Sequence, residues 1–337
     1  MKNNHQPKQA TVEKPIRFKG PSLFGFSDST IVVSPSEHNW VTFIKKGENN
    51  EAALLSLPNV YATRGKKAKA RYMRVITPSA DYQKANRYQG FLVAEHLASA
   101  LHLTGITNVD VTFFKNRLQK GVSVPAYGPG IRNFYCELIE QKKELNHPVS
   151  GIEAVSNSSF TLLDGVIERE ISVEPSDKLE IIVESTEYKD VPKLDSEPVH
   201  IRDAYQELVR HTSARPLARL GNPLLYMAWS LGKKIVCRGV GEENYVLVKP
   251  GDTATDITER MQEQYRKGRN EHLYHTALDF FGELYTIGSP DIKGRFRLKN
   301  STHITRIPAL KKFYESGAFQ KIHPEHQEDK RLTFYIN

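Results

Sequence analysis

The stretch HLYHTALDFFGELYTIG occupies residues 272–288 of this 337-residue sequence. It predicts a helix from about residue 270 to residue 285, which the glycine and proline that follow bring to an end. His275 and Asp279 are four residues apart, so both side chains project from one face of that helix, one turn apart. An imidazole and a carboxylate placed in this way can bind one metal ion, although the same spacing is common on helices that bind none.

A second stretch, FLVAEHLASALHLTG at residues 91–105, predicts an amphipathic helix that Gly105 ends as a left-handed cap. It carries Glu95 and His96 side by side. A hydrolytic zinc site typically has three protein ligands and leaves the fourth position for water. His96 can therefore complete a site begun by the other stretch, and Glu95 can accept a proton from the attacking water.

These two stretches, in this order, resemble the zinc-dependent UDP-3-O-acyl-N-acetylglucosamine deacetylases, which act in lipid A synthesis. Weaker similarities lie at residues 20–35, 169–184 and 300–303, and the resemblance extends over roughly residues 16–313. The resemblance implies an α+β fold. Two α/β sandwich domains of similar topology would pack their helix layers together, with the metal site between them.

The metal ligands implied by the resemblance are His96, His275 and Asp279. Zinc is the expected ion, and iron(II) is the alternative because two nitrogens and one oxygen suit both metals. His272 lies three residues before His275 and can replace Asp279 as a ligand. We favour Asp279 because the resemblance selects it.

Three further residues acquire catalytic or supporting roles from the resemblance. Glu95 is the general base, and His303 is the second acid–base group, which protonates the departing amine or stabilises the charged intermediate. Glu283, one turn after the aspartate ligand, takes the supporting position that orients His303. Its side chain is longer than the one the family usually carries there, so its reach differs.

The sequence also departs from the family pattern. Thr276 stands where a lysine usually contacts the nucleotide diphosphate, and Lys299 lies one residue further from His303 than in the family. We assign both Thr276 and Lys299 to substrate binding. The oxyanion threonine of the family is absent from both alignments of residues 214–221.

These features predict a metal-dependent deacetylase that acts on an N-acetylated aminosugar, either the lipid A precursor or a related glycan or nucleotide sugar. The alternatives are a zinc-binding paralogue that hydrolyses a different amide and a catalytically impaired regulatory pseudoenzyme. Retention of Glu95 and His303 counts against the pseudoenzyme, because a structural metal site needs neither a base nor an acid.

The net charge of +8 is compatible either with solvated surface lysines that bind nothing or with an anionic partner, and basic residues cluster at 64–71 and 266–269. A nucleotide diphosphate, an anionic membrane surface and nucleic acid are the candidates. No nucleic-acid-binding motif accompanies the charge, so we expect no nucleic acid partner. We expect a nucleotide-sugar or glycolipid-type substrate and consider peripheral contact with an anionic membrane.

The expected cellular location is inferred from features that the sequence lacks. It has no run of 18 apolar residues and no apolar core in its first fourteen residues, so we expect neither a membrane span nor a secretory signal. Cys136 and Cys237 make no disulfide framework, which favours the cytoplasm. We expect a monomer.

Runs of strands followed by helices predict an α+β organisation. We expect a flexible tail at residues 1–15, a first sandwich domain at 16–145, a second at 155–320 and a C-terminal tail at 321–337. The linker between the domains is expected within residues 142–159, and a last helix at 310–315.

Overall fold

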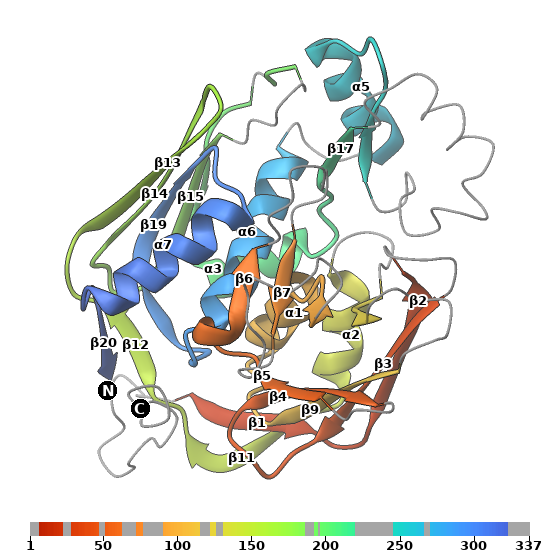
Figure 1. Cartoon of the computed structure of the whole chain (residues 1–337), viewed down its shortest axis with the longest axis vertical. Helices are drawn as coiled ribbons and strands as arrows, with labels where there is room; N and C mark the ends of the chain where they lie inside the picture. Colours follow the sequence, from red (N-terminus) through yellow and green to blue (C-terminus); the bar gives the residue numbers. More distant parts are fainter. Residues whose placement is uncertain are drawn as a thin grey trace.

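The computed structural model combines sheets and helices in a mixed α/β fold, as the expected α+β class requires (Figure 1). The residues that it describes are 7–22, 28–46, 51–62, 72–76, 90–114, 122–125, 131–185, 192–194, 196–219, 245–265 and 270–322.

A five-stranded sheet forms one side of the molecule in the order β2-β3-β9-β4-β5. Only β4 and β9 pair in parallel. Alternate residues such as Phe43 and Phe113 are buried against the helices, which is the period-two pattern of a half-covered sheet. The strands and the two helices above them are β2 (Ile16–Pro21), β3 (Asp28–Pro35), β4 (Val41–Lys46), β5 (Glu51–Leu54), β9 (Val109–Phe114), α1 (Glu95–Thr104) and α2 (Arg132–Glu140).

A larger, seven-stranded sheet lies on the other side, and β19 pairs with three of its strands. β19 pairs with β14 along one edge and with β15 and β12 along the other. Helices α6 and α7 pack on this sheet. The elements are β12 (Gly151–Ala154), β13 (Ser158–Asp164), β14 (Ile167–Glu174), β15 (Leu179–Ser185), β16 (Val199–Ile201), β19 (Ile292–Lys299), β20 (Phe319–Ile322), α6 (Glu271–Tyr285) and α7 (His303–Glu315).

Helices α1 and α6 pack directly against each other and thereby connect the two sheets. The hydroxyl of Ser99 donates to the carbonyl oxygen of Leu278 at 2.8 Å, and the His102 ring bonds the carbonyl oxygen of Phe281 at 2.7 Å. One continuous hydrophobic cluster includes residues of both sheets. This contact fixes the two helices that carry the predicted metal ligands.

Smaller elements complete the described structure. They are β1 (Lys8–Val12) with β11 (Lys142–Pro148); β6 (Val60–Ala62), β7 (Met73–Val75), β8 (Phe91–Leu92) and β10 (Val122–Ser123) in a four-stranded sheet; β17 (Leu217–Arg219) with β18 (Val246–Val248); α3 (Ala204–Glu207); α5 (Ala254–Tyr265); and the 3-10 helices η1 (Leu57–Asn59) and η2 (Leu208–His211).

The expected N-terminal tail and linker are wrong in part. Residues Lys8–Val12 form β1, in which Thr11 donates its hydroxyl to the carbonyl oxygen of Asn108. The polar residues of the expected linker form β11, β12 and the start of β13. β11 and β13 are polar because most side chains of β11 and alternate side chains of β13 reach water, whereas Gln9 and Thr11 of β1 are buried and form hydrogen bonds. Of the expected C-terminal tail, residues 321 and 322 belong to β20 and the rest lies outside the described residues.

The predicted helices agree with the structure more closely than the predicted tail and linker do. Gly105 adopts the left-handed conformation that the cap requires, with a φ of 68°. α6 begins one residue after the expected start, whereas α1 begins at Glu95 because the preceding residues pair as β8. α7 begins at His303, well before the expected start, and contains Pro308. A proline inside a helix removes one backbone hydrogen bond, so its position obscured this helix in the sequence.

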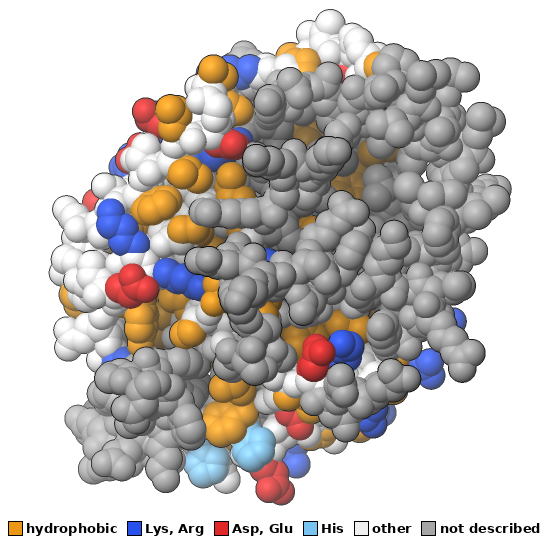
Figure 2. All heavy atoms as spheres, viewed as in Figure 1, with side chains coloured by type: hydrophobic (Ala, Val, Ile, Leu, Met, Phe, Trp, Pro, Cys, Tyr) orange, Lys and Arg blue, Asp and Glu red, His pale blue; other side chains and the backbone are white. Residues whose placement is uncertain are grey.

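No described helix is long and apolar enough to cross a membrane. Both basic runs, at residues 64–71 and 266–269, lie outside the described residues, so the structure does not place their charges. On the face shown in Figure 2, acidic and basic side chains of the described part alternate without forming a continuous basic patch.

Candidate metal centre

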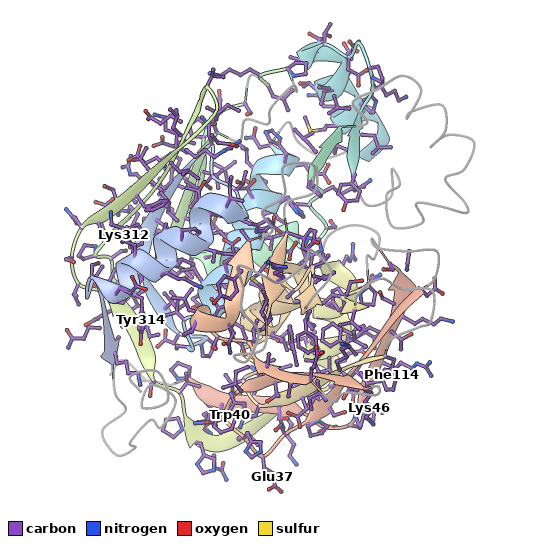
Figure 3. All side chains as sticks on the ribbon, in the orientation of Figure 1. Glu37, Trp40, Lys46, Phe114, Lys312 and Tyr314 are labelled. Carbon is purple, nitrogen blue, oxygen red and sulfur yellow. The ribbon has the colours of Figure 1, made fainter. Side chains whose placement is uncertain are left out.

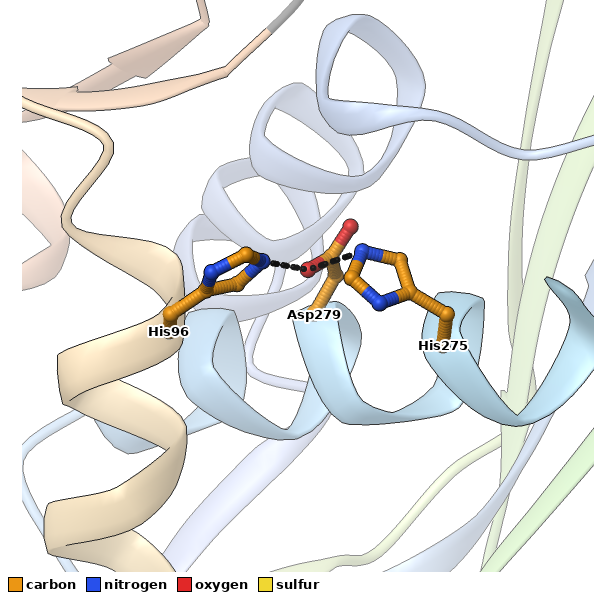
Figure 4. A group of neighbouring side chains, drawn as sticks. All are labelled: His96, His275 and Asp279. Carbon is orange, nitrogen blue, oxygen red and sulfur yellow. Dashed lines mark ion pairs between the residues drawn. The ribbon is translucent and has the colours of Figure 1, made fainter. Parts of the chain in front are cut away.

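The candidate metal centre consists of His96 on α1 with His275 and Asp279 on α6, three side chains whose donor atoms could hold a metal ion (Figure 4). One donor atom from each side chain lies within 4.8 Å of the other two. Nε2 of His275 is 3.3 Å and Nε2 of His96 is 3.5 Å from the same carboxylate oxygen, Oδ1 of Asp279. Both imidazole rings therefore point at one carboxylate from different helices.

The donor chemistry of this cluster fits a divalent ion. Nδ1 of His275 bonds the carbonyl oxygen of Ala214 at 3.0 Å, which assigns the proton to Nδ1 and leaves the Nε2 lone pair towards Asp279. Oδ1 of Asp279 is buried and accepts no hydrogen bond from the described residues. Although burial opposes ionisation, His275 and His96 hold the pKa of Asp279 well below its ordinary value. The ionised carboxylate of Asp279 and the two imidazoles together make a suitable ligand set for zinc or iron.

Glu95 is the first residue of α1 and is buried beside this cluster. The backbone N–H of Met73 donates to its Oε2 at 3.1 Å, and its Oε1 lies 3.8 Å from Nε2 of His303. Burial raises the pKa of Glu95 above its ordinary value, against the opposing effect of the nearby histidines. The carboxylate is thus fixed by one backbone bond and has one oxygen directed at the cluster.

His303 begins α7 and lies on the opposite side of the aspartate, with Nε2 3.5 Å from Oδ2 of Asp279. Its Nδ1 donates a short hydrogen bond to Glu283, whose side chain is fully buried. Nε of Arg306 donates to the other oxygen of Glu283 at 2.8 Å. Burial opposes protonation of His303, but the Glu283 and Asp279 carboxylates raise its pKa overall. The longer side chain of Glu283 therefore does reach His303.

The structure does not bring Lys299 to this cluster. Phe296 and Leu298 of β19 are buried, and the side chains between and after them face the other side of the sheet. Nζ of Lys299 lies 3.4 Å from Glu168 and is substantially exposed. This placement differs from the substrate-binding position expected from the sequence, because strand alternation turns Lys299 outwards.

Thr276 and His272 are buried on α6 but are not members of the ligand group. The hydroxyl of Thr276 donates to the carbonyl oxygen of His272 at 3.0 Å. Nδ1 of His272 is buried without a hydrogen-bond partner among the described residues, and burial lowers its pKa to about 4. His272 is therefore not part of the group formed by the three donors.

Two residues near the cluster were not singled out from the sequence. Arg306 is buried against Glu283, and its position three residues after His303 on one helix is the only sequence signal for it. Tyr245 precedes β18 in a segment without a motif. Burial, together with the charges of Glu95 and Asp279, raises the pKa of the Tyr245 phenol. Its hydroxyl therefore stays protonated near the cluster.

Comparison with known protein families agrees with this geometry. A family model described as UDP-3-O-acyl N-acetylglycosamine deacetylase matches residues 9–315 of the chain. The match includes both helices of the metal centre and all of α7. No curated protein sequence matches the chain.

Proposed function

Because the chain belongs to the UDP-3-O-acyl N-acetylglycosamine deacetylase family, we propose that it is a zinc-dependent hydrolase that removes an acetyl group from an N-acetylated aminosugar. The family is one of deacetylases of lipid A synthesis. The observation that carries the proposal is the convergence of three metal-type donors with Glu95 and His303 at one buried cluster.

The residue roles follow from positions around Asp279. His96, His275 and Asp279 would hold the metal, which when bound polarises the acetyl carbonyl and eases deprotonation of water. Glu95 takes the proton of the attacking water, since its free oxygen faces the cluster. His303 gives a proton to the departing amine from the other side of Asp279.

Glu283 and Arg306 act on His303 without touching the substrate. The carboxylate of Glu283 accepts from Nδ1 and so directs Nε2 towards the cluster. Arg306 fixes the other oxygen of that carboxylate. A charged partner on Nδ1 also favours the protonated ring that an acid requires.

A second candidate, hydrolysis of a different amide, is supported by Thr276. This position carries no cation, and the threonine hydroxyl bonds its own helix. Lys299 is paired with Glu168 on the outer face of the sheet. Neither expected diphosphate contact is therefore available in this arrangement, so the substrate need not be linked to a nucleotide.

We also propose that residues 16–145 and 155–320 form two sandwich domains whose helix layers meet at α1 and α6. The contact of these helices and the two separate main sheets support that division. A monomer in the cytoplasm, in peripheral contact with anionic membranes, is the proposed working state.

Metal analysis of purified protein tests the site directly. We expect about one divalent ion per chain, most often zinc, and its loss in His275→Ala and in Asp279→Ala. His272→Ala is the matched control, because it removes a buried histidine of the same helix that lies outside the donor group. Unchanged metal content in both ligand variants would refute the site.

Acetate release from UDP-3-O-acyl-N-acetylglucosamine, compared with acetate release from simpler N-acetylated sugars, tests the substrate class.

A further inference from the structure

A cavity of about 610 Å³ lies at the ends of α6 and α7, away from the metal centre. Its size is in the range of small-molecule binding sites. The first residue of α6 that lines the cavity is Tyr285. Tyr285 is six residues beyond Asp279, which corresponds to about 9 Å along a helix. Its described lining includes no side chain of the metal centre, so it is a separate feature of the fold.

The walls of this cavity come from elements distant in sequence. β4 and the residues after β5 form one wall, β12 another, and the turn after α6 a third. Figure 3 labels Trp40 and Tyr314, which contribute from the five-stranded sheet side and from α7. The lining is mainly apolar, and its larger apolar side chains include Trp40, Leu55, Leu57, Ile152, Ile287 and Tyr314.

Two lysines, Lys311 and Lys321, are in the lining, and Lys311 is the one whose ammonium lies beside the apolar wall. Its Nζ lies 3.9 Å from the ring centroid of Tyr61 and 3.4 Å from the carbonyl oxygen of Pro58. No carboxylate in the described ranges is within ion-pair distance of it. Burial lowers the pKa of Lys311 to about 8. A partly desolvated ammonium at an apolar wall is stabilised by an anion that enters the cavity.

We propose that this cavity is a second ligand site, which takes an amphiphile with an apolar body and a single carboxylate that pairs with Lys311. The apolar walls favour a hydrocarbon or similar body over a sugar or nucleotide, because polar groups buried there would lack partners. Glu315 lies in the same lining and disfavours ligands with several negative charges. The proposal does not depend on the deacetylase reaction.

Trp40 provides a local probe, since it lines the cavity and the sequence contains only two tryptophans. We would titrate the intact, metal-loaded protein with 12-bromododecanoate, whose bromine quenches tryptophan fluorescence at short range. Saturable quenching is expected in the wild type and is expected to be lost in Trp40→Phe. The neutral 12-bromododecanol should bind about tenfold or more weakly, because charge-assisted hydrogen bonds are worth about 1.5–3 kcal/mol.

Two lysine variants make the charge test specific. Lys311→Gln should weaken the carboxylate about tenfold and leave the alcohol unchanged. Lys312→Gln is the matched control, because Lys312 is the exposed neighbour on the same helix and is not part of the lining. Thermal unfolding of both variants verifies that they are folded.

Three results would overturn the proposal. The first is absence of saturable quenching in the wild type. The second is equal carboxylate affinity in the two lysine variants, which would show that Lys311 does not hold the anion. The third is undiminished quenching in Trp40→Phe, which would place the ligand near the other tryptophan instead of this cavity.

Discussion

A Cβ atom on Gly282 would lie 2.3 Å from the carbonyl oxygen of Glu95 and 2.9 Å from the backbone nitrogen of Ser99. These are backbone atoms of α1, so they cannot rotate away as a side chain would. α6 therefore needs glycine at this position to approach α1 closely. The same approach places Glu95 and His96 beside Asp279, because Gly282 is less than one turn from the aspartate.

We predict that Gly282→Ala lowers both stability and metal affinity. On helix propensity alone, replacing an interior glycine by alanine stabilises a helix by about 1 kcal/mol. The contact with α1 should reverse that sign, because the helices must separate by several tenths of an ångström. Urea unfolding of the metal-free variant and metal titration measure the two effects. A variant that is more stable than the wild type and binds metal equally well would contradict the argument.

We predict that Glu95→Gln keeps the metal but loses most of the hydrolytic activity. Glutamine preserves the shape and can still accept the backbone N–H of Met73, but it cannot take up a proton. General base catalysis is typically worth about 10²–10⁴-fold in rate. Metal content and kcat should be measured on the same preparation. If metal and activity disappear together, Glu95 is a ligand and its assignment as the base is incorrect.

We predict that Glu283→Ala destabilises the protein by about 3–5 kcal/mol, since it leaves the buried guanidinium of Arg306 without its main carboxylate. The double variant Glu283→Ala/Arg306→Met should recover much of the stability, because it removes both charges. Its kcat should stay low, since His303 has lost the acceptor for Nδ1. Urea unfolding and steady-state kinetics separate the two effects. A double variant as unstable as the single one would show that the charge pair is not the cause.

The sequence predicted that the side chains of the candidate metal centre come together, because their signals are local. His275 and Asp279 share a helix face at fixed spacing, and Glu95 and His96 are adjacent. The sequence left undetermined only whether the two helices pack against each other. The direction of Lys299 depends instead on the register and facing of β19, which local spacing does not reveal. Tyr245 approaches the cluster through a tertiary contact that no motif marks.

Strands at the margins of the sheets were not predicted, because their residues are polar. Residues of β11 look like a linker because most of their side chains reach water. Residues of β1 look like a tail although Gln9 and Thr11 are buried, because these polar side chains bond Pro148 and Asn108. α5 was not predicted, and the start of α7 was missed because Pro308 interrupts its pattern. Apolar periodicity identifies elements that bury one apolar face, whereas β11 buries little, β1 buries polar side chains and α7 contains a helix breaker.

We predict that the stability of the metal-free protein falls with acid partly through His102. Burial lowers the pKa of this histidine to about 3, whereas the unfolded chain has the ordinary value of about 6.5. Between these values the unfolded state binds a proton that the folded state does not, so stability decreases as the pH falls from about 6.5 to about 3. The slope is at most about 1.4 kcal/mol per pH unit.

His102→Gln tests this contribution, since glutamine retains a donor for the carbonyl oxygen of Phe281 but does not titrate. Urea unfolding at several pH values should give a shallower acid slope than the wild type below pH 6.5 and the same slope above pH 7. Parallel curves over the whole range would show that His102 titrates normally in the folded protein.

The last prediction concerns the nucleotide. With Thr276 in place of a lysine, we expect UDP-3-O-acyl-N-acetylglucosamine to be turned over less efficiently than by a typical member of the family. Loss of a charge-assisted contact to phosphate costs about 1.5–3 kcal/mol, which corresponds to about a ten- to hundredfold lower kcat/KM. Lys299 cannot compensate from the outer face of its sheet, where it pairs with Glu168, so Lys299→Ala should leave kcat/KM unchanged. Steady-state assays of this chain beside such a family member, under the same buffer and salt, measure both effects. Equal kcat/KM values, or a clear loss of kcat/KM in Lys299→Ala, would mean that other cations of this chain bind the diphosphate. Threonine in place of lysine at position 276 would then not change the substrate specificity.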